Sequence, residues 1–285
     1  MTKKAQVMEI GVISHSRTGE NPFDSIARHG VHVTQFCNWI IDNCTAEYGK
    51  KIKKMAKDSQ VRLNSLWAGY SGNCVWNFTE GPTTLGIVPP ELREQRVKEL
   101  MRGAELAAWC GVPAIATHCG FIPENPSDPL YPGVLDAIGR VATRCAELGL
   151  GFWFETGQET PVTILRVIED LNMDNLGVNF DTGNLILYGK ANPLDAVAVF
   201  GKYIRNLHVK DGLPPTCGRE LGKEVAVGKG LSNYPKLLPA LYAAGYRGDL
   251  IIEREISGEQ QIKDIRKTIV YLDKYVRKTL EKAAK

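Results

Sequence analysis

Short apolar or β-branched runs alternate with longer segments of helical periodicity along the chain. Turn residues bound each of the short runs, which is typical of strands. Helical segments such as residues 91–110 and 132–148 lie between them and stop just before Gly111 and Gly149, where helices commonly end. The pattern predicts eight strands, at residues 7–14, 31–37, 61–68, 113–118, 151–155, 176–181, 204–209 and 249–253.

This order of strands and helices predicts the fold class. Strands separated by helices cannot form hairpins, so they pair in parallel, and their continuous apolar character indicates burial on both faces. Eight such units in 285 residues match an α/β fold, the closed (β/α)8 barrel with its helices outside. An open doubly wound sheet is the alternative, but the segment SHSRTGENP after the first strand lacks a glycine-rich phosphate fingerprint. The helical segment 259–280 carries one apolar stripe, which suits it to close the ring.

Composition adds little beyond an ordinary globular protein. Hydrophobic residues make up 44% and charged residues 24%, and no linker interrupts the chain, so residues 1–285 are expected to form a single domain. The net charge of +3 is too small to indicate a nucleic-acid partner. The seven cysteines form no CxxC pair, the N-terminal segment has no cleavage site, and no apolar stretch could span a membrane. We therefore expect a cytoplasmic protein without a membrane segment.

Three connections are long once the helices are subtracted, at residues 69–89, 120–130 and 212–233. All three follow strands, so in a barrel they lie at the C-terminal end, where active sites of this fold are built. Long connections without secondary structure are usually functional in compact domains. We expect these three to surround the site.

Each of the last four predicted strands ends at a side chain that can bind a metal. These side chains are Glu155, Asp181, His208 and Glu253. Parallel strands bring their C-terminal ends to one rim, so the four should converge although about 100 residues separate the first from the last. The simpler interpretation is that each is a lone polar group, paired with Arg or Lys or solvated.

Three carboxylates held close together strongly disfavour one another unless protons or a cation neutralise them. One divalent metal ion would resolve this conflict. The oxygen-rich ligand set favours Mn²⁺, which we expect first, and Mg²⁺ and Co²⁺ are alternatives. A structural zinc site is not expected, but a Zn²⁺ ion in an open site is a further alternative.

The second half of the chain resembles a known superfamily. The motifs that carry the resemblance are THCG (117–120), FETGQE (154–159), NFDTGN (179–184), LHVKDG (207–212) and GYRGDLIIERE (245–255). They are similar to those of the xylose-isomerase-like TIM barrels, and in particular of the sugar phosphate isomerase/epimerase group. That group includes ketose 3-epimerases, inosose dehydratases and an apurinic endonuclease branch. The resemblance implies that Glu155, Asp181, His208 and Glu253 bind one divalent metal and that Glu155 and Glu253 also act as catalytic acid/base groups.

The implied chemistry is proton transfer next to a ketone. A metal chelated by the ketone oxygen and the neighbouring hydroxyl stabilises the enediolate that forms when a proton is removed. Return of the proton to the other face or to the adjacent carbon gives epimerisation or isomerisation, and departure of a β-hydroxyl gives dehydration. The sequence thus predicts a sugar, keto-sugar or sugar phosphate isomerase or epimerase. A lyase acting on an inosose or 3-keto-sugar is the alternative, followed by a carbohydrate-binding barrel without activity.

Departures from the family motifs narrow the choice of branch. The endonuclease branch carries extra histidines; Asn184 stands where its second ligand from the sixth strand would be, and no Asp-x-His follows the seventh strand. Ketose 3-epimerases usually carry a histidine and an arginine at the positions of Asn184 and Pro214. Nucleic acid is therefore not the expected partner, and the usual mode of binding free ketoses is in doubt.

Further side chains near the strand ends are candidates for substrate binding, each with a structural alternative. They are His118, Asn184, Lys210, Gln158 and Trp67. His118 and Trp67 could equally belong to the core, and Lys210 could form a buried ion pair. The expected partner is a small carbohydrate, and a homo-oligomer is left open.

Overall fold

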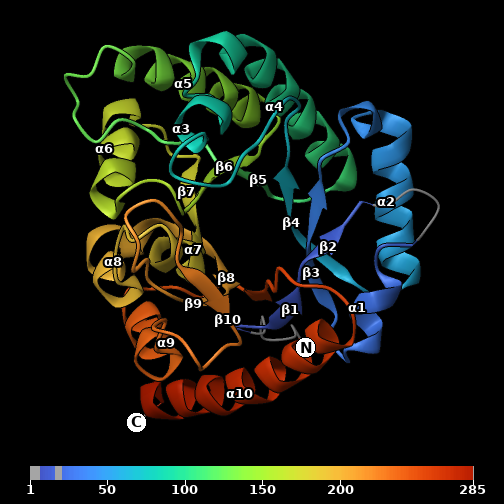
Figure 1. Ribbon diagram of the computed structural model, residues 1–285. Helices are drawn as coiled ribbons and strands as arrows, with labels where there is room; N and C mark the ends of the chain where they lie inside the picture. The colour runs from blue at the N-terminus through green and yellow to red at the C-terminus, as the bar shows by residue number, and fades with distance from the viewer. Residues whose placement is uncertain (1–6, 17–20, 285) are drawn as a thin grey trace.

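A ring of parallel strands forms the centre of the molecule, and helices surround it (Figure 1). The computed structural model describes residues 7–16 and 21–284; residues 1–6, the basic start of the segment considered for targeting, lie outside this part of the chain. The ring order is β1-β11-β8-β7-β6-β5-β4-β3-β2, with every neighbouring pair parallel. The strands are β1 (Ile10–Val12), β2 (Ser14–His15), β3 (Val33–Asn38), β4 (Arg62–Ala68), β5 (Ala114–Thr117), β6 (Gly151–Glu155), β7 (Leu176–Asp181), β8 (Ile204–Val209) and β11 (Leu250–Ile252). This arrangement confirms the predicted (β/α)8 barrel.

The first strand closes the ring by changing partner halfway along. Its first part, β1, pairs with β11, and its second part, β2, pairs with β3. Gly11 permits the close approach to β3, because a Cβ atom there would lie 2.4 Å from the carbonyl oxygen of Val33. The strand predicted at 7–14 was wrong at its start, since Met8 has a left-handed φ of 56° and pairing begins at Ile10.

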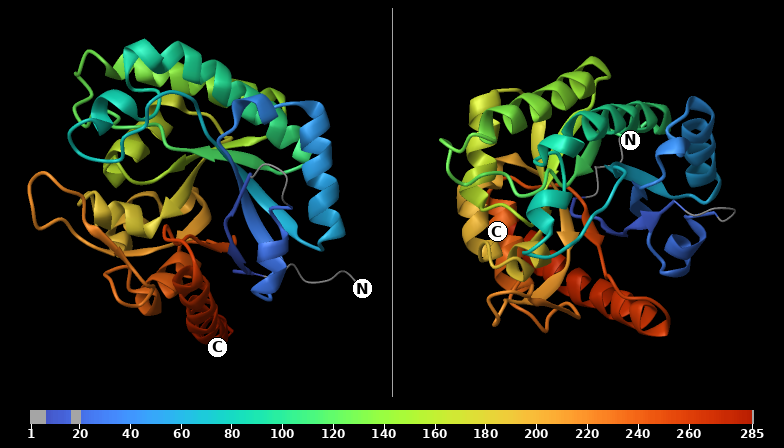
Figure 2. Two further views of the ribbon diagram at one scale, coloured as in Figure 1. Left: turned by 45° about the vertical axis from the view of Figure 1, so that its right-hand side comes forward. Right: turned by 45° about the horizontal axis from the view of Figure 1, so that its top comes forward.

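The helices lie outside the strands, as both views of Figure 2 show. They are α1 (Asp24–Arg28), α2 (Ala46–Asp58), α3 (Gly81–Thr84), α4 (Pro90–Cys110), α5 (Tyr131–Glu147), α6 (Pro161–Leu171), α7 (Thr182–Leu187), α8 (Pro193–Phe200), α9 (Tyr234–Ala243) and α10 (Glu259–Ala283), with 3-10 turns at Ile41–Asn43 and Gly201–Tyr203. Gly111 has a φ of 76° at the end of α4, the left-handed conformation that ends helices. The helices predicted at 91–110, 132–148 and 259–280 each agree with the structure to within three residues.

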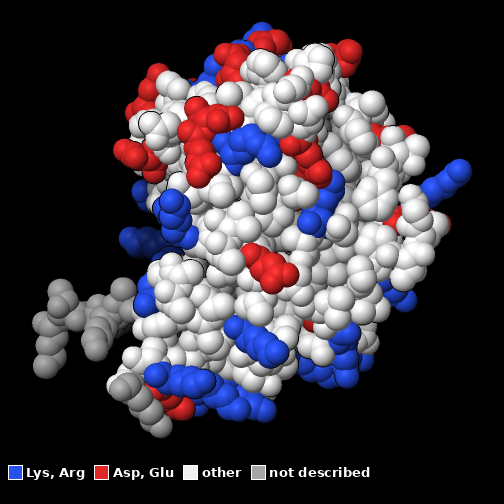
Figure 3. Space-filling view, turned by 90° about the vertical axis from the view of Figure 1, so that its left-hand side faces the viewer, with Lys and Arg blue, Asp and Glu red and all other residues white. Residues whose placement is uncertain are grey.

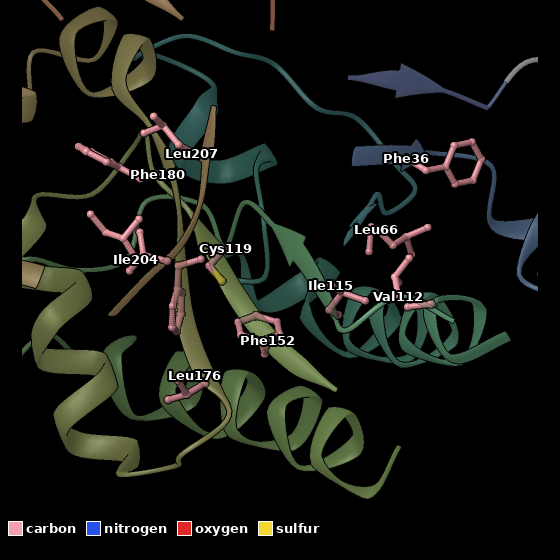
Figure 4. Close-up of a cluster of buried hydrophobic side chains, with 14 of the residues drawn as sticks. Phe36, Leu66, Val112, Ile115, Cys119, Phe152, Leu176, Phe180, Ile204 and Leu207 are labelled. Atoms are coloured by element: carbon pink, nitrogen blue, oxygen red, sulfur yellow. The ribbon is translucent and has the colours of Figure 1, made fainter. Parts of the chain in front are cut away.

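Alternate side chains of the strands enter two different cores. Phe36, Ile115 and Phe152 belong to the large core between the strands and the helices, part of which Figure 4 shows. Their neighbours in sequence enter a smaller cluster formed by Cys37, Trp67, Ala114, Ala116 and Trp153. This alternation is the period of two expected for strands, and it places the smaller cluster inside the barrel.

The connection at 69–89 contains the short helix α3 and is held by Arg96 of α4. Arg96 is fully buried, and its guanidinium lies 4.5 Å from the centre of the Tyr70 ring. It donates hydrogen bonds of 2.7–3.1 Å to four backbone carbonyls of this connection, those of Ser71, Asn73, Thr84 and Gly86. One side chain therefore orders most of the connection.

The connection at 212–233, predicted to be without secondary structure, contains an antiparallel hairpin. Its strands are β9 (Asp211–Leu213) and β10 (Lys223–Val225). The buried carboxylate of Asp211 accepts hydrogen bonds of 2.9–3.0 Å from four backbone N–H groups, those of Gly212, Gly228, Gly230 and Ser232. A Cβ atom on Gly230 would lie 2.3 Å from Asp211 Oδ1, so only glycine fits beside this carboxylate.

The surface carries charges of both signs. On the face shown in Figure 3, acidic side chains are more frequent toward the top and basic side chains toward the bottom, with charges of both signs between them. Within residues 7–16 and 21–284, no helix is long and apolar enough to cross a membrane.

Candidate metal centre

Four side chains that can bind a metal meet at the C-terminal ends of four consecutive strands of the ring. Glu155 ends β6, Asp181 ends β7, His208 lies near the end of β8, and Glu253 directly follows β11. One ligand atom from each lies within 4.8 Å of those of the other three. We call this set of four the acidic arc. The structure brings together all four residues that the sequence singled out.

The distances within the acidic arc centre on one nitrogen of the histidine. His208 Nδ1 lies 2.8 Å from Glu155 Oε1, 3.2 Å from Glu253 Oε2 and 3.7 Å from Asp181 Oδ2. The side chain of Glu253 is 15% exposed and the other three side chains are buried. Neither His208 Nδ1 nor Asp181 Oδ2 forms a hydrogen bond within the described structure, although buried polar atoms normally do. Polar atoms left unpaired around one point fit a shared divalent cation.

Asp181 divides its two oxygens between the backbone and the acidic arc. Oδ1 caps α7 by accepting a hydrogen bond of 2.7 Å from the backbone N–H of Asn184. Thr156 holds the same strand end through two hydrogen bonds with the backbone of Asp181. With Oδ1 fixed in this way, Oδ2 is directed to the other ligands.

A buried lysine lies beside the acidic arc. Lys210 Nζ is 2.9 Å from Glu255 Oε2, 3.5 Å from Glu253 Oε2 and 3.7 Å from Asp181 Oδ2. The carboxylates of Glu155, Asp181, Glu253 and Glu255 carry four negative charges when all are ionised. The ammonium group of Lys210 neutralises one of them, so three remain when His208 is neutral. This surplus is the electrostatic reason for a divalent ion here.

The pKa values within the acidic arc are displaced in opposite directions. Burial raises the pKa of Glu155 and of Asp181. Burial would do the same to Glu253, but Lys210 and His208 together outweigh it and hold the pKa of Glu253 well below its usual value. Burial opposes the charged form of His208, yet Glu155 and Glu253 outweigh this effect and hold its pKa well above 6.5. In the absence of an ion, the arc thus retains protons that ion binding would displace.

A cavity of about 840 Å³ adjoins the acidic arc and is lined by two of its members, Glu155 and Glu253. Trp39, Trp67, Trp76 and His118 form another part of its lining, which we call the aromatic wall. The Trp39 and Trp67 rings lie 4.7 Å apart, and the His118 ring contacts Trp76 at 5.0 Å and Trp67 at 5.8 Å. The cavity has the size of small-molecule sites in proteins, about 300–1,000 Å³.

His118 is neutral within this wall. Its side chain is 5% exposed, and burial lowers its pKa to about 3. Its Nδ1 atom has no hydrogen-bond partner within the described structure. A buried, unpaired ring nitrogen at a cavity wall can accept or donate one hydrogen bond to a bound hydroxyl.

The other candidates for substrate binding are divided between the cavity and its surroundings. Trp67, His118 and Asn184 line the cavity. Lys210 and Gln158 are almost fully buried and are not among the residues that line it. Lys210 instead contacts the carboxylates, and both amide atoms of Gln158 lack hydrogen-bond partners in the described part of the chain.

A layer of buried amide side chains below the acidic arc was missed in the sequence. Gln35, Asn179 and Asn206 are fully buried and hydrogen-bonded to one another or to the ligands. Asn179 and Asn206 lie two residues before Asp181 and His208, on the same face of their strands. A polar residue two positions before a ligand, inside an otherwise apolar run, was the signal that could have found them.

Comparison with known proteins places the fold in a family. Residues 23–275 match the model of the family described as xylose isomerase-like TIM barrel. The crystal structure of a xylose isomerase domain protein from Planctomyces limnophilus superposes with a TM-score of 0.91 at 32% identity, covering 96% of this chain and 99% of that one. The structure of a D-tagatose 3-epimerase-like protein superposes with a TM-score of 0.76 at 20% identity, covering 97% and 100% of the two chains.

A relative with a described activity matches over a shorter region. The inosose dehydratase of Lacticaseibacillus casei is 25% identical over 148 residues, which are 45% of this chain and 48% of that protein. The match thus spans about half the length of this relative. On the family model and the similarity to the Planctomyces protein, the chain belongs to the xylose isomerase-like TIM barrel family.

Proposed function

We propose that this protein is a divalent-metal-dependent isomerase or epimerase of a sugar, keto-sugar or sugar phosphate. The observation that carries the proposal is the acidic arc, whose four ligand atoms lie within 4.8 Å of one another beside a cavity of small-molecule size. The similarity to sugar epimerase folds, a D-tagatose 3-epimerase-like protein among them, supports it.

Glu155, Asp181, His208 and Glu253 would hold the ion, and Mn²⁺ is the ion we propose, because carboxylate and imidazole ligands suit it. When bound, the ion would supply the positive charge that stabilises the enediolate of the substrate. Glu155 and Glu253 are the outer members of the arc and line the cavity. In this proposal one removes the proton next to the ketone and the other returns a proton to the opposite face or to the adjacent carbon.

Residues around the acidic arc would orient the substrate. His118, Asn184 and Trp67 line the cavity and would contact sugar hydroxyls or a sugar face. Lys210 lies 3.5 Å from Glu253 Oε2 and 2.9 Å from Glu255 Oε2. We therefore assign Lys210 to positioning Glu253, and Gln158, which is buried outside the cavity wall, to supporting the end of β6.

The test of this proposal is turnover before and after metal removal. The protein is stripped with EDTA and assayed against D-tagatose, D-psicose, D-fructose and L-ribulose in D₂O, with and without added Mn²⁺. We expect deuterium incorporation at the epimerised carbon that requires the ion. Turnover that is unchanged after stripping would contradict the proposal.

A dehydratase is the second candidate, because the match to an inosose dehydratase points to it. The same arc would serve, with a β-hydroxyl leaving the enediolate as water after a glutamate has donated a proton to it. The same assay with an inosose separates the two functions. Loss of 18 mass units from the product would support the dehydratase, and deuterium incorporation without that loss would support the epimerase.

A further inference from the structure

The amide layer below the acidic arc connects opposite sides of the barrel. Gln35 lies on β3, and its partners Asn179 and His208 lie on β7 and β8. In the ring, three strands separate β3 from β7 on one side, and β8, β11 and the first strand separate them on the other (Figure 1). Gln35 therefore reaches across the interior of the barrel, where apolar side chains usually fill the space.

The hydrogen bonds of this layer have one consistent direction when Glu155 serves as a metal ligand, because a metal-binding carboxylate is deprotonated. A carboxylate only accepts, so the Asn179 group that contacts Glu155 Oε2 is the amide nitrogen, Nδ2. Asn179 Oδ1 then faces the other way and accepts from Asn206 Nδ2 at 2.6 Å and from Gln35 Nε2 at 3.1 Å. Gln35 Nε2 also donates to Ser65 Oγ at 2.9 Å.

The direction of these hydrogen bonds also determines which nitrogen of His208 carries the proton. With Nε2 of Gln35 engaged, its carbonyl oxygen Oε1 faces His208 Nε2 at 2.6 Å. A carbonyl oxygen accepts, so His208 Nε2 must carry a proton. A metal-binding imidazole is neutral and has one N–H, so with that proton on Nε2 the lone pair of Nδ1, which faces the three carboxylates of the acidic arc, would be available to the ion.

We propose that Gln35 is a positioning residue of the metal centre, which fixes the His208 proton on Nε2 and thereby makes Nδ1 the ligand atom. This inference rests on the proposed function in that it takes the acidic arc as the metal centre. Asn179 hydrogen-bonds to both Glu155 and Gln35, so the orientation of the Gln35 amide depends on that of the Glu155 carboxylate. Two ligands from different strands are thus oriented by one chain of amides, as outer groups commonly orient metal-binding histidines.

The first test observes the proton directly in the unmodified protein. The chain has five histidines, so ¹⁵N-labelled imidazole signals can be assigned with single His→Gln variants. With one equivalent of Zn²⁺, which is diamagnetic, we expect the proton of His208 on Nε2, slowly exchanging with water, and none on Nδ1. A proton on Nδ1, or an Nε2 without one, would overturn the proposal.

The second test measures the affinity of the EDTA-stripped protein for Mn²⁺ by calorimetry. Gln35→Met keeps the length of the side chain but removes the acceptor, and we expect Mn²⁺ affinity to fall by about 10–100-fold, as for other groups that orient ligands. Gln35→Glu keeps an acceptor for His208 Nε2 but loses the donor to Asn179 Oδ1, so it should retain the proton on Nε2 and lose less Mn²⁺ affinity than Gln35→Met. Thr34→Val is the matched control, because Thr34 is fully buried on the same strand and its hydroxyl contacts Val12 O, Ser14 Oγ and the backbone carbonyl of Gln35, but neither the Gln35 side chain nor the arc.

Three results would overturn the inference: Gln35→Met binding Mn²⁺ like the unmodified protein, Gln35→Glu weakened as much as Gln35→Met, or Thr34→Val weakened as much as either. If Gln35→Met does not fold, the imidazole spectrum of the unmodified protein decides. Neither test needs a substrate. A protein that binds Mn²⁺ as described but turns over no sugar would therefore contradict the proposed function and leave this inference standing.

Discussion

The acidic arc and the aromatic wall come from different halves of the chain and carry different chemistry. The acidic arc comes from β6, β7, β8 and the residue after β11, and presents three carboxylates and an imidazole. The aromatic wall comes from β4 and the connections after β3, β4 and β5, and presents three indole rings and a neutral imidazole. Under the proposed function, the second half of the barrel would supply the reacting groups, whereas the first half would shape the space in which the substrate binds.

Two buried histidines show how far the acidic arc and the aromatic wall differ. His118 and His208 are both almost fully buried. Burial lowers the pKa of His118 to about 3, and the opposing effect of Glu253 and Glu255 is too small to compensate. His208 experiences the same burial, but Glu155 and Glu253 raise its pKa well above 6.5. The neighbouring charged groups therefore determine the pKa, and with it the charge, of each histidine at this rim.

The largest effect is expected from the acidic arc. Glu155→Gln and Glu253→Gln each remove a proposed acid/base group while keeping its shape, and should lower kcat by about 10²–10⁴-fold. The control is Glu94→Gln, because Glu94 is exposed, contacts Arg140 and does not line the cavity. Steady-state kinetics with unchanged circular dichroism would check this. Full activity in either variant would show that the acidic arc does not supply the reacting groups and so is not distinguished from the aromatic wall in this way.

The next effect concerns the stability of the connection that carries Trp76. Arg96→Met leaves four backbone carbonyls without their donor, so we expect the free energy of unfolding to fall by about 3 kcal/mol. Arg102→Met is the matched control on the same helix, where an exposed arginine makes one hydrogen bond to Ile41 O, and should cost less than about 0.5 kcal/mol. Urea unfolding measures both. Equal losses would show that Arg96 does not organise this side of the cavity.

The neutral His118 predicts a pH dependence of stability. The unfolded chain binds a proton at His118 below a pKa of 6.5, whereas the folded chain does so only below about 3, so stability from this residue falls as the pH falls through this window. Between pH 7 and pH 5 the loss should be about 2 kcal/mol greater in the unmodified protein than in His118→Gln. Urea unfolding at both pH values measures the difference. Parallel losses would mean that His118 is charged in the folded protein.

The smallest effect is expected at the exposed end of the aromatic wall. Trp76 is 39% exposed and lines the cavity, so Trp76→Ala should weaken substrate binding by about 0.5–1.5 kcal/mol, which raises KM about two- to tenfold. kcat should change little, because the proposed reacting groups belong to the acidic arc. Trp76→Phe keeps a ring and should restore most of the affinity. A fall in kcat with unchanged KM would instead place Trp76 with the reacting groups.

The barrel and the convergence of the ligands could be predicted from the sequence, because both follow from strand order. The strands at 151–155, 176–181 and 204–209 were predicted with their observed bounds, since polar residues mark where each apolar run stops. Parallel pairing then determines that their ends share a rim. The ligand set therefore required only local patterns and one topological rule.

The amide layer and the hairpin could not be predicted in this way. Gln35 acts on His208 across 173 positions of sequence, and only the closed ring brings the two together. The hairpin β9–β10 depends on Asp211, whose hydrogen-bond partners at Gly228, Gly230 and Ser232 are also distant in sequence. Both features rest on tertiary hydrogen bonds, which leave no periodic pattern in the chain.

The Asp211 carboxylate, which accepts hydrogen bonds from four backbone N–H groups, has a practical consequence for engineering of the hairpin. It clamps the start of the hairpin and the residues that follow it, so the tip between Leu213 and Lys223 is anchored at both ends. Tips of this kind tolerate insertions when the backbone on either side is held by buried hydrogen bonds. Libraries that vary residues 214–221 in length and composition, and keep Gly222, should therefore leave the neighbouring Lys210 undisturbed, which makes the tip a suitable place to engineer new substrate contacts.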